Sequence, residues 1–152
     1  MPQYESNQTI VGYVRRLQAG FSGFNAQNIL LGGQPVQMLH SAMLYNKSKI
    51  FIAIFTSPQH KKDCLVITLS LFNIPDQGTE ELFEQLLSWN NGATEVVRFT
   101  LDEVVKTINL MCVRPIEGLS FEEFQHCLDS ILAVAKNSVD RLQREYGLIR
   151  IG

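Results

Sequence analysis

The chain has 152 residues, of which 45% are hydrophobic and 18% charged, and its formal net charge is −2. This length predicts one domain, residues 1–152, that buries roughly two-thirds of its unfolded surface. The hydrophobic content excludes a disordered chain. The lack of net positive charge argues against a nucleic-acid partner.

The location of the protein is predicted from its first residues and its cysteines. Met1–Ser6 lacks the basic and apolar stretches of a signal peptide, and no window approaches the roughly 20 apolar residues that span a bilayer. Cys64, Cys112 and Cys127 are odd in number and lie in apolar contexts, as buried free thiols do. We therefore expect a cytoplasmic protein that does not insert into a membrane.

The first predicted element is an amphipathic helix over residues 7–19. Ile10, Val14 and Leu17 recur at helical spacing, and Gly20 follows as a stop signal. Residues 21–35 contain several glycines without a sustained period, so we interpret them as connecting structure. The alternative is that residues 29–31 within this stretch form a short strand.

Three strands are predicted next, over residues 36–45, 50–56 and 65–72, in an antiparallel arrangement. Both alternating sets of residues 49–55 are apolar. Either both faces of this strand are covered, or one meets a partner. We therefore take Ile50, Ile52 and Ile54 as candidate protein-interaction residues.

A second helix is predicted over residues 79–90, ended by Asn91-Gly92, and its Trp89 is a fourth candidate for a protein contact. Two strands follow, over residues 96–101 and 104–113, with a turn near Asp102-Glu103.

The last predicted element is a long helix. Ser120-Phe121-Glu122-Glu123 is a capping box, and apolar residues keep helical spacing from there to Gly147. Such a helix has about 26 residues and a length of roughly 39 Å. The predicted fold is therefore α+β, with the order helix, three antiparallel strands, helix, two antiparallel strands and long C-terminal helix. The helices are expected to pack on one antiparallel sheet.

No residue pattern predicts catalysis or cofactor binding. The histidines and cysteines lack the paired spacing of a zinc motif, no serine or cysteine lies in a nucleophile motif, and Gly32-Gly33 lacks the rest of a phosphate loop. The acidic clusters lie at helix starts or in a turn. We predict no catalytic, cofactor or metal residue, and a protein that is not an enzyme.

The second half of the sequence resembles a known family. The motifs are Leu86-Leu87-Ser88-Trp89-Asn90, then Phe99-Thr100-Leu101-Asp102, then Leu119-Ser120-Phe121-Glu122-Glu123. Together, over residues 79–148, they resemble the YbjN-like branch of the type III secretion chaperone-like superfamily, which has the CesT/Tir chaperone fold. Similar proteins occur in cyanobacteria, which lack that secretion system, so a role in secretion does not follow.

The resemblance implies a dimer that wraps a segment of a client protein. The predicted function is therefore a chaperone-like or adaptor homodimer that binds a segment of another protein, with no cofactor. Two alternatives stay open: a small-ligand binder or enzyme whose site is not visible in the sequence, and a structural subunit of a larger complex. An exposed apolar patch would favour the first function, and an enclosed pocket of roughly 300 Å³ or more would favour ligand binding.

Overall fold

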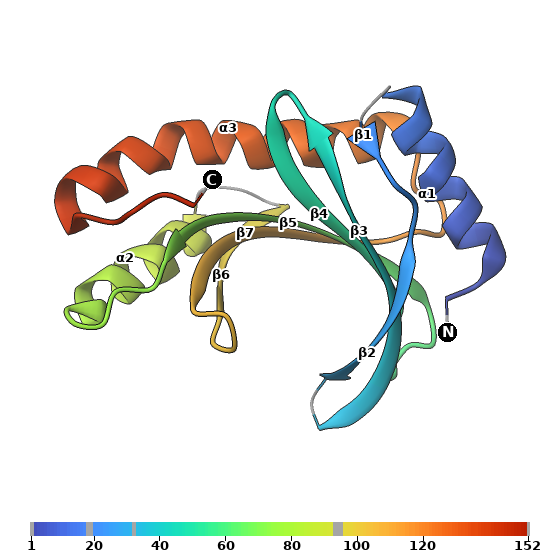
Figure 1. The fold of residues 1–152 in the computed structure, drawn as a ribbon, viewed down its shortest axis with the longest axis horizontal. Helices are drawn as coiled ribbons and strands as arrows, with labels where there is room; N and C mark the ends of the chain where they lie inside the picture. The colour runs from blue at the N-terminus through green and yellow to red at the C-terminus, as the bar shows by residue number, and fades with distance from the viewer. Residues whose placement is uncertain (1, 18–19, 32, 93–95, 152) are drawn as a thin grey trace. The chain divides into compact units, whose positions relative to one another are not determined.

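A computed structural model describes residues 2–17, 20–31, 33–92 and 96–151. The elements in these residues (Figure 1) are α1 (Tyr4–Arg16), β1 (Gly20–Phe21), β2 (Asn25–Leu31), β3 (Gln34–Tyr45), β4 (Ser48–Thr56), β5 (Asp63–Asn73), α2 (Thr79–Gly92), β6 (Val97–Asp102), β7 (Thr107–Pro115) and α3 (Phe121–Tyr146). Hydrogen bonds join the strands in the order β1-β3-β4-β5-β7-β6, and β2 also pairs with β3. The predicted α+β class and the long last helix are confirmed.

Contacts divide the chain into two compact units. The first comprises residues 1–67 and 113–125, and the second comprises residues 68–112 and 126–152. Strands β5 and β7 and helix α3 contribute residues to both units.

The first unit is formed by α1, the strands β1–β4 and the beginning of β5. Strands β3 and β4 are antiparallel and are joined by Asn46 and Lys47, which have φ angles of 48° and 67°. A two-residue turn with left-handed backbone is the usual connection of a β-hairpin. Side chains alternate between the two faces of each strand. One set is buried in a core that also contains Ile10 and Val14 of α1.

Helix α1 begins at Tyr4 and ends at Arg16, so both predicted ends are about three residues too late. Its first turn is completed from a distant part of the chain. The Asp63 carboxylate accepts hydrogen bonds from the Gln3 backbone N–H at 2.8 Å and from the Ser6 hydroxyl at 2.6 Å. A helix start normally needs such an acceptor nearby in sequence, and here tertiary contact supplies it.

The prediction of connecting structure for residues 21–35 was wrong, because β1 and β2 form here along the same side of β3. Phe21 pairs with Met43, and Asn25 pairs with His40. Residues 22–24, between β1 and β2, therefore stand opposite only residues 41–42 of β3. This is a β-bulge, and Gly23 in it has a φ of +95°, which favours glycine. The missed signal was Gly32-Gly33 between two apolar runs, a typical hairpin turn.

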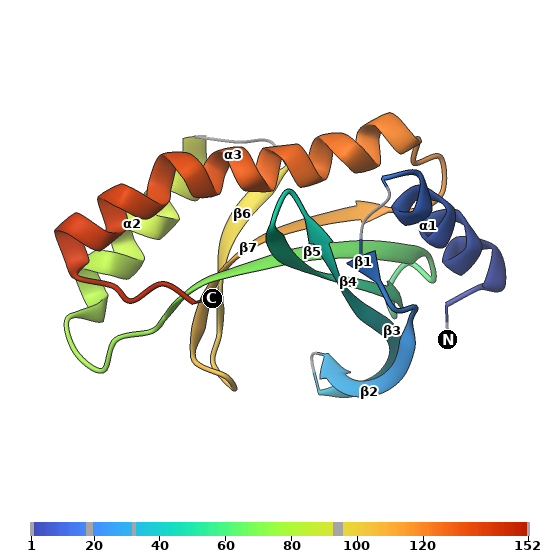
Figure 2. The same ribbon diagram turned by 45° about the horizontal axis from the view of Figure 1, so that its top comes forward.

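The second unit contains α2, β6, most of β7 and most of α3 (Figure 2). The sequence predicted that the last strand begins at Val104, but β7 begins at Thr107. The reason is a local turn in which Asp102 Oδ1 accepts hydrogen bonds from the backbone N–H groups of Val104 and Val105, at 2.9 and 3.1 Å. After α3 the chain returns to β5, where the Ile151 N–H donates to the Leu71 carbonyl at 2.8 Å.

Helix α3 spans Phe121–Tyr146, its 26 residues matching the prediction. The Glu123 backbone N–H donates to the Ser120 hydroxyl at 3.1 Å, which confirms the predicted cap. The Glu123 carboxylate also forms an ion pair with Arg114 at 2.8 Å. At the other end Gly147 has a φ of 62° and closes the helix with an N–H donated to Gln143.

Candidate functional site

The most distinctive surface of the first unit is one face of the β3–β4 hairpin. Residues directly opposite one another in the register share a face, and these pairs include Met38 with Phe55 and Ala42 with Phe51. We name this set the outer face, and it consists of Met38, His40, Ala42, Leu44, Lys49, Phe51, Ala53 and Phe55. It is mostly apolar and contains no acidic side chain.

The outer face is accessible in the chain as it stands. Leu44 is 58% exposed and Phe51 is 42% exposed, and Met38, Ala42 and Phe55 are half-buried. Buried positions alternate with these along the same strands, because the opposite face forms the core. Several large apolar groups therefore meet water on neighbouring strands, which is typical of a surface that binds a partner.

The structure places the predicted interaction residues Ile50, Ile52 and Ile54 in the core, where they are 0%, 1% and 0% exposed. They cannot contact a partner without unfolding the unit, so this part of the prediction needs correction. Strand β4 does carry two apolar faces, as its sequence indicates. The accessible one belongs to Phe51, Ala53 and Phe55, and a strand pattern alone does not tell which set faces inward.

Trp89, the fourth predicted contact residue, lies in the second unit on α2 and is half-buried. Its ring packs against Phe99 of β6 with a centroid distance of 5.6 Å, and the Arg141 guanidinium lies 5.2 Å from its centroid. Trp89 thus fixes α2 to its neighbours and leaves part of its ring accessible.

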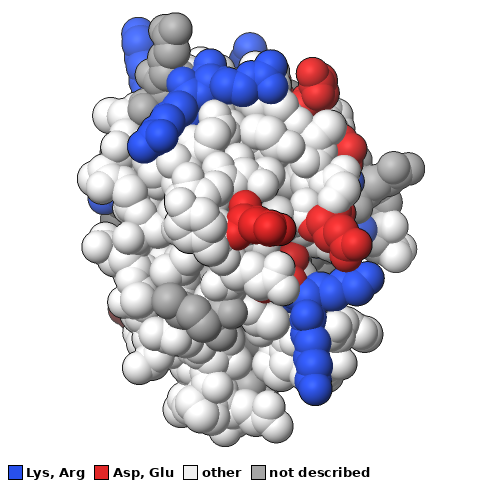
Figure 3. Space-filling view, turned by 90° about the vertical axis from the view of Figure 1, so that its right-hand side faces the viewer, with Lys and Arg blue, Asp and Glu red and all other residues white. Residues whose placement is uncertain are grey.

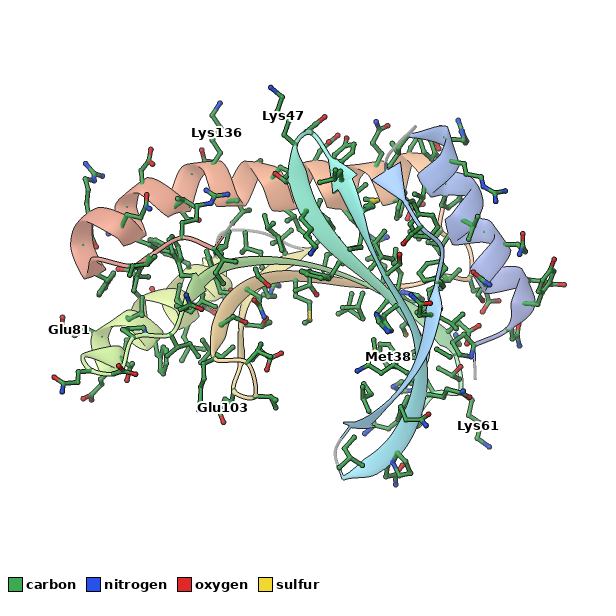
Figure 4. The ribbon with its side chains drawn as sticks, in the orientation of Figure 1. Met38, Lys47, Lys61, Glu81, Glu103 and Lys136 are labelled. Atoms are coloured by element: carbon green, nitrogen blue, oxygen red, sulfur yellow. The ribbon has the colours of Figure 1, made fainter. Side chains whose placement is uncertain are left out.

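Charge is placed at one end of the outer face. The Lys49 ammonium lies 5.3 Å from the centroid of Phe51, and Lys47 at the β3–β4 turn extends away from the strands (Figure 4). Both side chains are exposed. A bound segment with an acidic residue near this end would therefore meet a complementary charge.

A polar pocket of about 600 Å³, open to solvent, also lies in the first unit. Its walls come from α1, from the β4–β5 loop with Lys61 and Lys62, and from residues 116–119. Acidic and basic side chains lie close together on this side of the molecule (Figure 3). Two lining groups are already engaged within the chain, since Tyr13 donates to the Leu119 carbonyl at 2.6 Å and Asp63 holds the start of α1.

Asp63 has the most distinctive electrostatic environment near this pocket. Burial alone would raise the pKa of its carboxyl group. Hydrogen bonds from Ser6, from Thr56 and from the Gln3 backbone outweigh burial and hold the pKa below its usual value. Asp63 is therefore charged under ordinary conditions and acts as an acceptor that connects α1 to β4 and β5.

The cysteines and histidines form no chemical centre in the described residues. Cys112 and Cys127 are buried and Cys64 is half-buried, and none of these three described cysteines forms a disulfide. Burial raises the pKa of the Cys64 thiol, and the neighbouring Asp63 charge adds to this effect. The described ranges contain no group of three or more His, Cys, Asp or Glu side chains that could hold a metal ion. In the same ranges, no helix has the length and apolarity to cross a membrane.

The chain matches a chain in the crystal structure of the ExsC–ExsE complex with a TM-score of 0.56. The alignment covers 95% of this chain and 96% of that chain at 17% sequence identity, which shows a shared fold. No curated protein matches the sequence significantly.

The model of the Tir chaperone protein (CesT) family matches residues 49–138, more than half of the chain. The chain therefore belongs to the Tir chaperone protein (CesT) family. The predicted resemblance is confirmed, and the match also includes β4 and β5, which lie before the motifs recognised in the sequence. Membership supports a chaperone-like, protein-binding role for the chain.

Proposed function

We propose that the chain acts in the cytoplasm as a homodimeric chaperone that binds a segment of a client protein on the outer face. The observation that carries this proposal is the exposure of Leu44 and Phe51 beside half-buried apolar groups on two neighbouring strands. Burying such groups against a partner gains about 25 cal/mol for each Å² removed from water. This gain is available only when another chain covers the face.

The chemistry of the outer face indicates what the client segment carries. Apolar side chains at alternating or helical spacing would contact Phe51 and Phe55. An acidic residue would pair with Lys49, whose ammonium already lies near the Phe51 ring. The segment is therefore apolar with an acidic flank.

The homodimer and the location rest on separate observations. A dimer is what the resemblance to chaperones of this fold implies, and the family match supports that resemblance. Three cysteines that form no disulfide are typical of a protein in a reducing compartment, which supports the cytoplasm. We also keep Trp89 as a proposed contact residue, because part of its ring is accessible to a partner.

The test compares tagged wild-type protein with a Phe51→Asp variant in pull-downs from the native cell extract, with mass spectrometry of the bound proteins. Val104→Asp is the matched control, because Val104 is 92% exposed in the β6–β7 turn and the substitution introduces the same charge away from the outer face. We expect wild type and control to recover the same client and Phe51→Asp to recover at least tenfold less. Equal recovery by all three would contradict the outer face as the client site.

Light scattering on the purified wild-type protein tests the homodimer separately. A mass of twice the 17.2 kDa chain is expected. A partner that never exchanges and that copurifies at a fixed ratio would favour the alternative of a structural subunit.

A second candidate function is the binding of a small polar ligand in the α1 pocket. Its volume of about 600 Å³ exceeds the roughly 300 Å³ of a ligand site, but the pocket is open to solvent and not enclosed. Lys61 and Lys62 offer exposed positive charge beside Glu5 and Glu117. A screen of amino acids and other small zwitterions by thermal shift tests it. Stabilisation of wild type but not of Lys62→Glu would support this function, and no shift with any compound would remove it.

A further inference from the structure

His40 is a histidine among the apolar residues of the outer face. It belongs to β3, which lies between β2 and β4 in the sheet, and the register places it opposite Asn25 of β2 and Ala53 of β4. Its side chain is half-buried, and in the described part of the chain the ring has no hydrogen bond, ion pair or ring contact. The two ring nitrogens therefore depend on water for their hydrogen bonds.

The other two histidines lie outside the outer face. His126 is exposed on α3, and its Nε2 lies 3.4 Å from the Ser130 hydroxyl oxygen. His60 is exposed in the loop between β4 and β5. Of the three histidines in the chain, His40 is thus the one whose ring lies in the proposed client site.

The strands that pair with β3 place no acidic or titratable side chain directly beside His40. Its other neighbours on the same face are uncharged, and they are Gln27, Met38, Ala42, Phe51, Ala53 and Phe55. The nearest charged residue on this face is Lys49, four residues from Ala53 along β4. That distance is about 13 Å at roughly 3.3 Å per residue, so His40 has no charged partner within the described residues of the outer face.

A client that covers the outer face would exclude the water around the His40 ring. Burying a polar group without a partner opposes binding, so a client that presents only apolar groups here binds less well. A carboxylate meets no repulsion, because the outer face has positive charge at Lys49 and contains no acidic side chain. A hydrogen bond from an imidazolium to a carboxylate is also roughly twice as strong as a neutral one.

We propose that an acidic side chain of the client pairs with the protonated ring of His40, and that client binding is therefore tighter at acidic pH. This inference rests on the proposed function, because it names a contact and a pH dependence of the same outer face. An imidazole takes up its proton between about pH 8 and pH 5. The carboxylate of the client favours the charged ring, so the gain in affinity is present at the acidic end of this range and is lost as the pH rises.

The two basic positions of the outer face also predict a spacing in the client. Lys49 and His40 are separated by about 13 Å along the strands, which is the length of four residues of an extended segment or about nine residues of a helix. The client segment should therefore carry two acidic residues at one of these spacings, with apolar residues between them.

The first test repeats the pull-down from the native cell extract at pH 6.0 and at pH 8.0 with a histidine-free tag. It compares wild type, His40→Gln and His60→Gln. Glutamine is polar but takes up no proton in this range, and His60→Gln removes an exposed histidine outside the outer face. We expect wild type and His60→Gln to recover at least threefold more client at pH 6.0 than at pH 8.0, and His40→Gln to recover equal amounts.

The second test identifies the group on the client. Overlapping synthetic peptides from the recovered client are titrated with purified protein at both pH values, and fluorescence anisotropy gives the Kd. In the peptide that binds most tightly, each Asp or Glu is replaced in turn by Asn or Gln. One replacement should remove the pH dependence of the wild-type Kd and leave the Kd of His40→Gln within about twofold.

The outcomes separate this inference from the proposed function. The pairing is overturned, and the outer-face site stands, if Phe51→Asp loses the client but His40→Gln keeps the pH dependence of wild type. Binding by wild type that is equal or weaker at pH 6.0 would also overturn the pairing, as would a pH dependence that no acidic replacement in the peptide removes. If Phe51→Asp recovers as much client as wild type, the outer-face site and this inference fail together.

Discussion

The side-chain amide of Asn90 forms two hydrogen bonds with the backbone of a single residue, Phe99. It accepts from the Phe99 N–H at 2.7 Å and donates to the Phe99 carbonyl at 2.9 Å. Both residues belong to the motifs that carried the family resemblance, and the geometry explains them. The asparagine at the end of α2 fixes the helix to the edge strand β6.

Removing this amide should destabilise the second unit. Asn90→Ala is expected to lower the free energy of unfolding by about 2 kcal/mol, because two hydrogen bonds are lost and two backbone groups lose their partner. Asn91→Ala, at the exposed neighbouring position, should change it by less than about 0.5 kcal/mol. Urea unfolding of both variants measures the difference, and equal stabilities would show that the Asn90 bonds contribute nothing.

Asp63 should make stability depend on pH. Its folded pKa lies below the value of about 3.9 for an unfolded aspartate. The contribution is therefore present above that value and is lost as pH falls through the folded pKa. Asp63→Asn should cost about 1 kcal/mol at pH 6, a modest amount because water reaches this half-buried site.

The pH dependence is measured by urea unfolding of wild type and Asp63→Asn at pH 6 and at pH 2.5. The difference between the two proteins should shrink at pH 2.5. Asp76→Asn, at an exposed position, serves as the control. A difference that is the same at both pH values would rule out the charged carboxylate as the origin of the effect.

Truncation on the two faces of β4 should have different effects on stability and on client binding. Ile52 is 1% exposed, so Ile52→Ala should lower the free energy of unfolding by about 3 kcal/mol. Phe51 is 42% exposed, so Phe51→Ala should cost only about 1 kcal/mol. Phe51→Ala, but not Ile52→Ala, should weaken client binding tenfold. Binding is measured on the folded variants with the client identified by pull-down. The proposed site fails if Phe51→Ala binds like wild type.

The start of α3 should depend on its cap. Ser120→Ala removes the acceptor of the Glu123 N–H and should cost about 1 kcal/mol. Ser120→Asp, which restores an acceptor, should recover most of this loss. Ser88→Ala on the exposed surface of α2 is the neutral comparison. A Ser120→Ala variant as stable as wild type would mean that water replaces the cap.

We propose that the two compact units unfold together as the single domain predicted from the length. Strands β5 and β7 and helix α3 run through both units, so neither can unfold without breaking elements of the other. Calorimetry should show one transition with equal calorimetric and van't Hoff enthalpies. Two resolved transitions would show two domains.

Much of the fold follows from local patterns. Residues 120–147 carry a cap, a helical apolar spacing and a glycine stop, so α3 was predicted with the correct length. The strands β4, β5 and β6 were also predicted within about two residues. Each of these signals acts between neighbours in sequence, and the structure leaves them unchanged.

Other features depend on distant contacts. The bulged strand of β1 and β2 exists because β3 pairs with it, although its own residues have few strand formers. The start of α1 is set by Asp63, 57 residues after Ser6. No local rule connects those positions.

The sequence by itself determined the class, the order of most elements and the presence of two apolar faces on β4. Only the tertiary structure decided that Ile50, Ile52 and Ile54 form the core and that Phe51 lies on the outer face. The physical reason is that a strand has a period of two, so its pattern shows two faces without telling which one the helices cover.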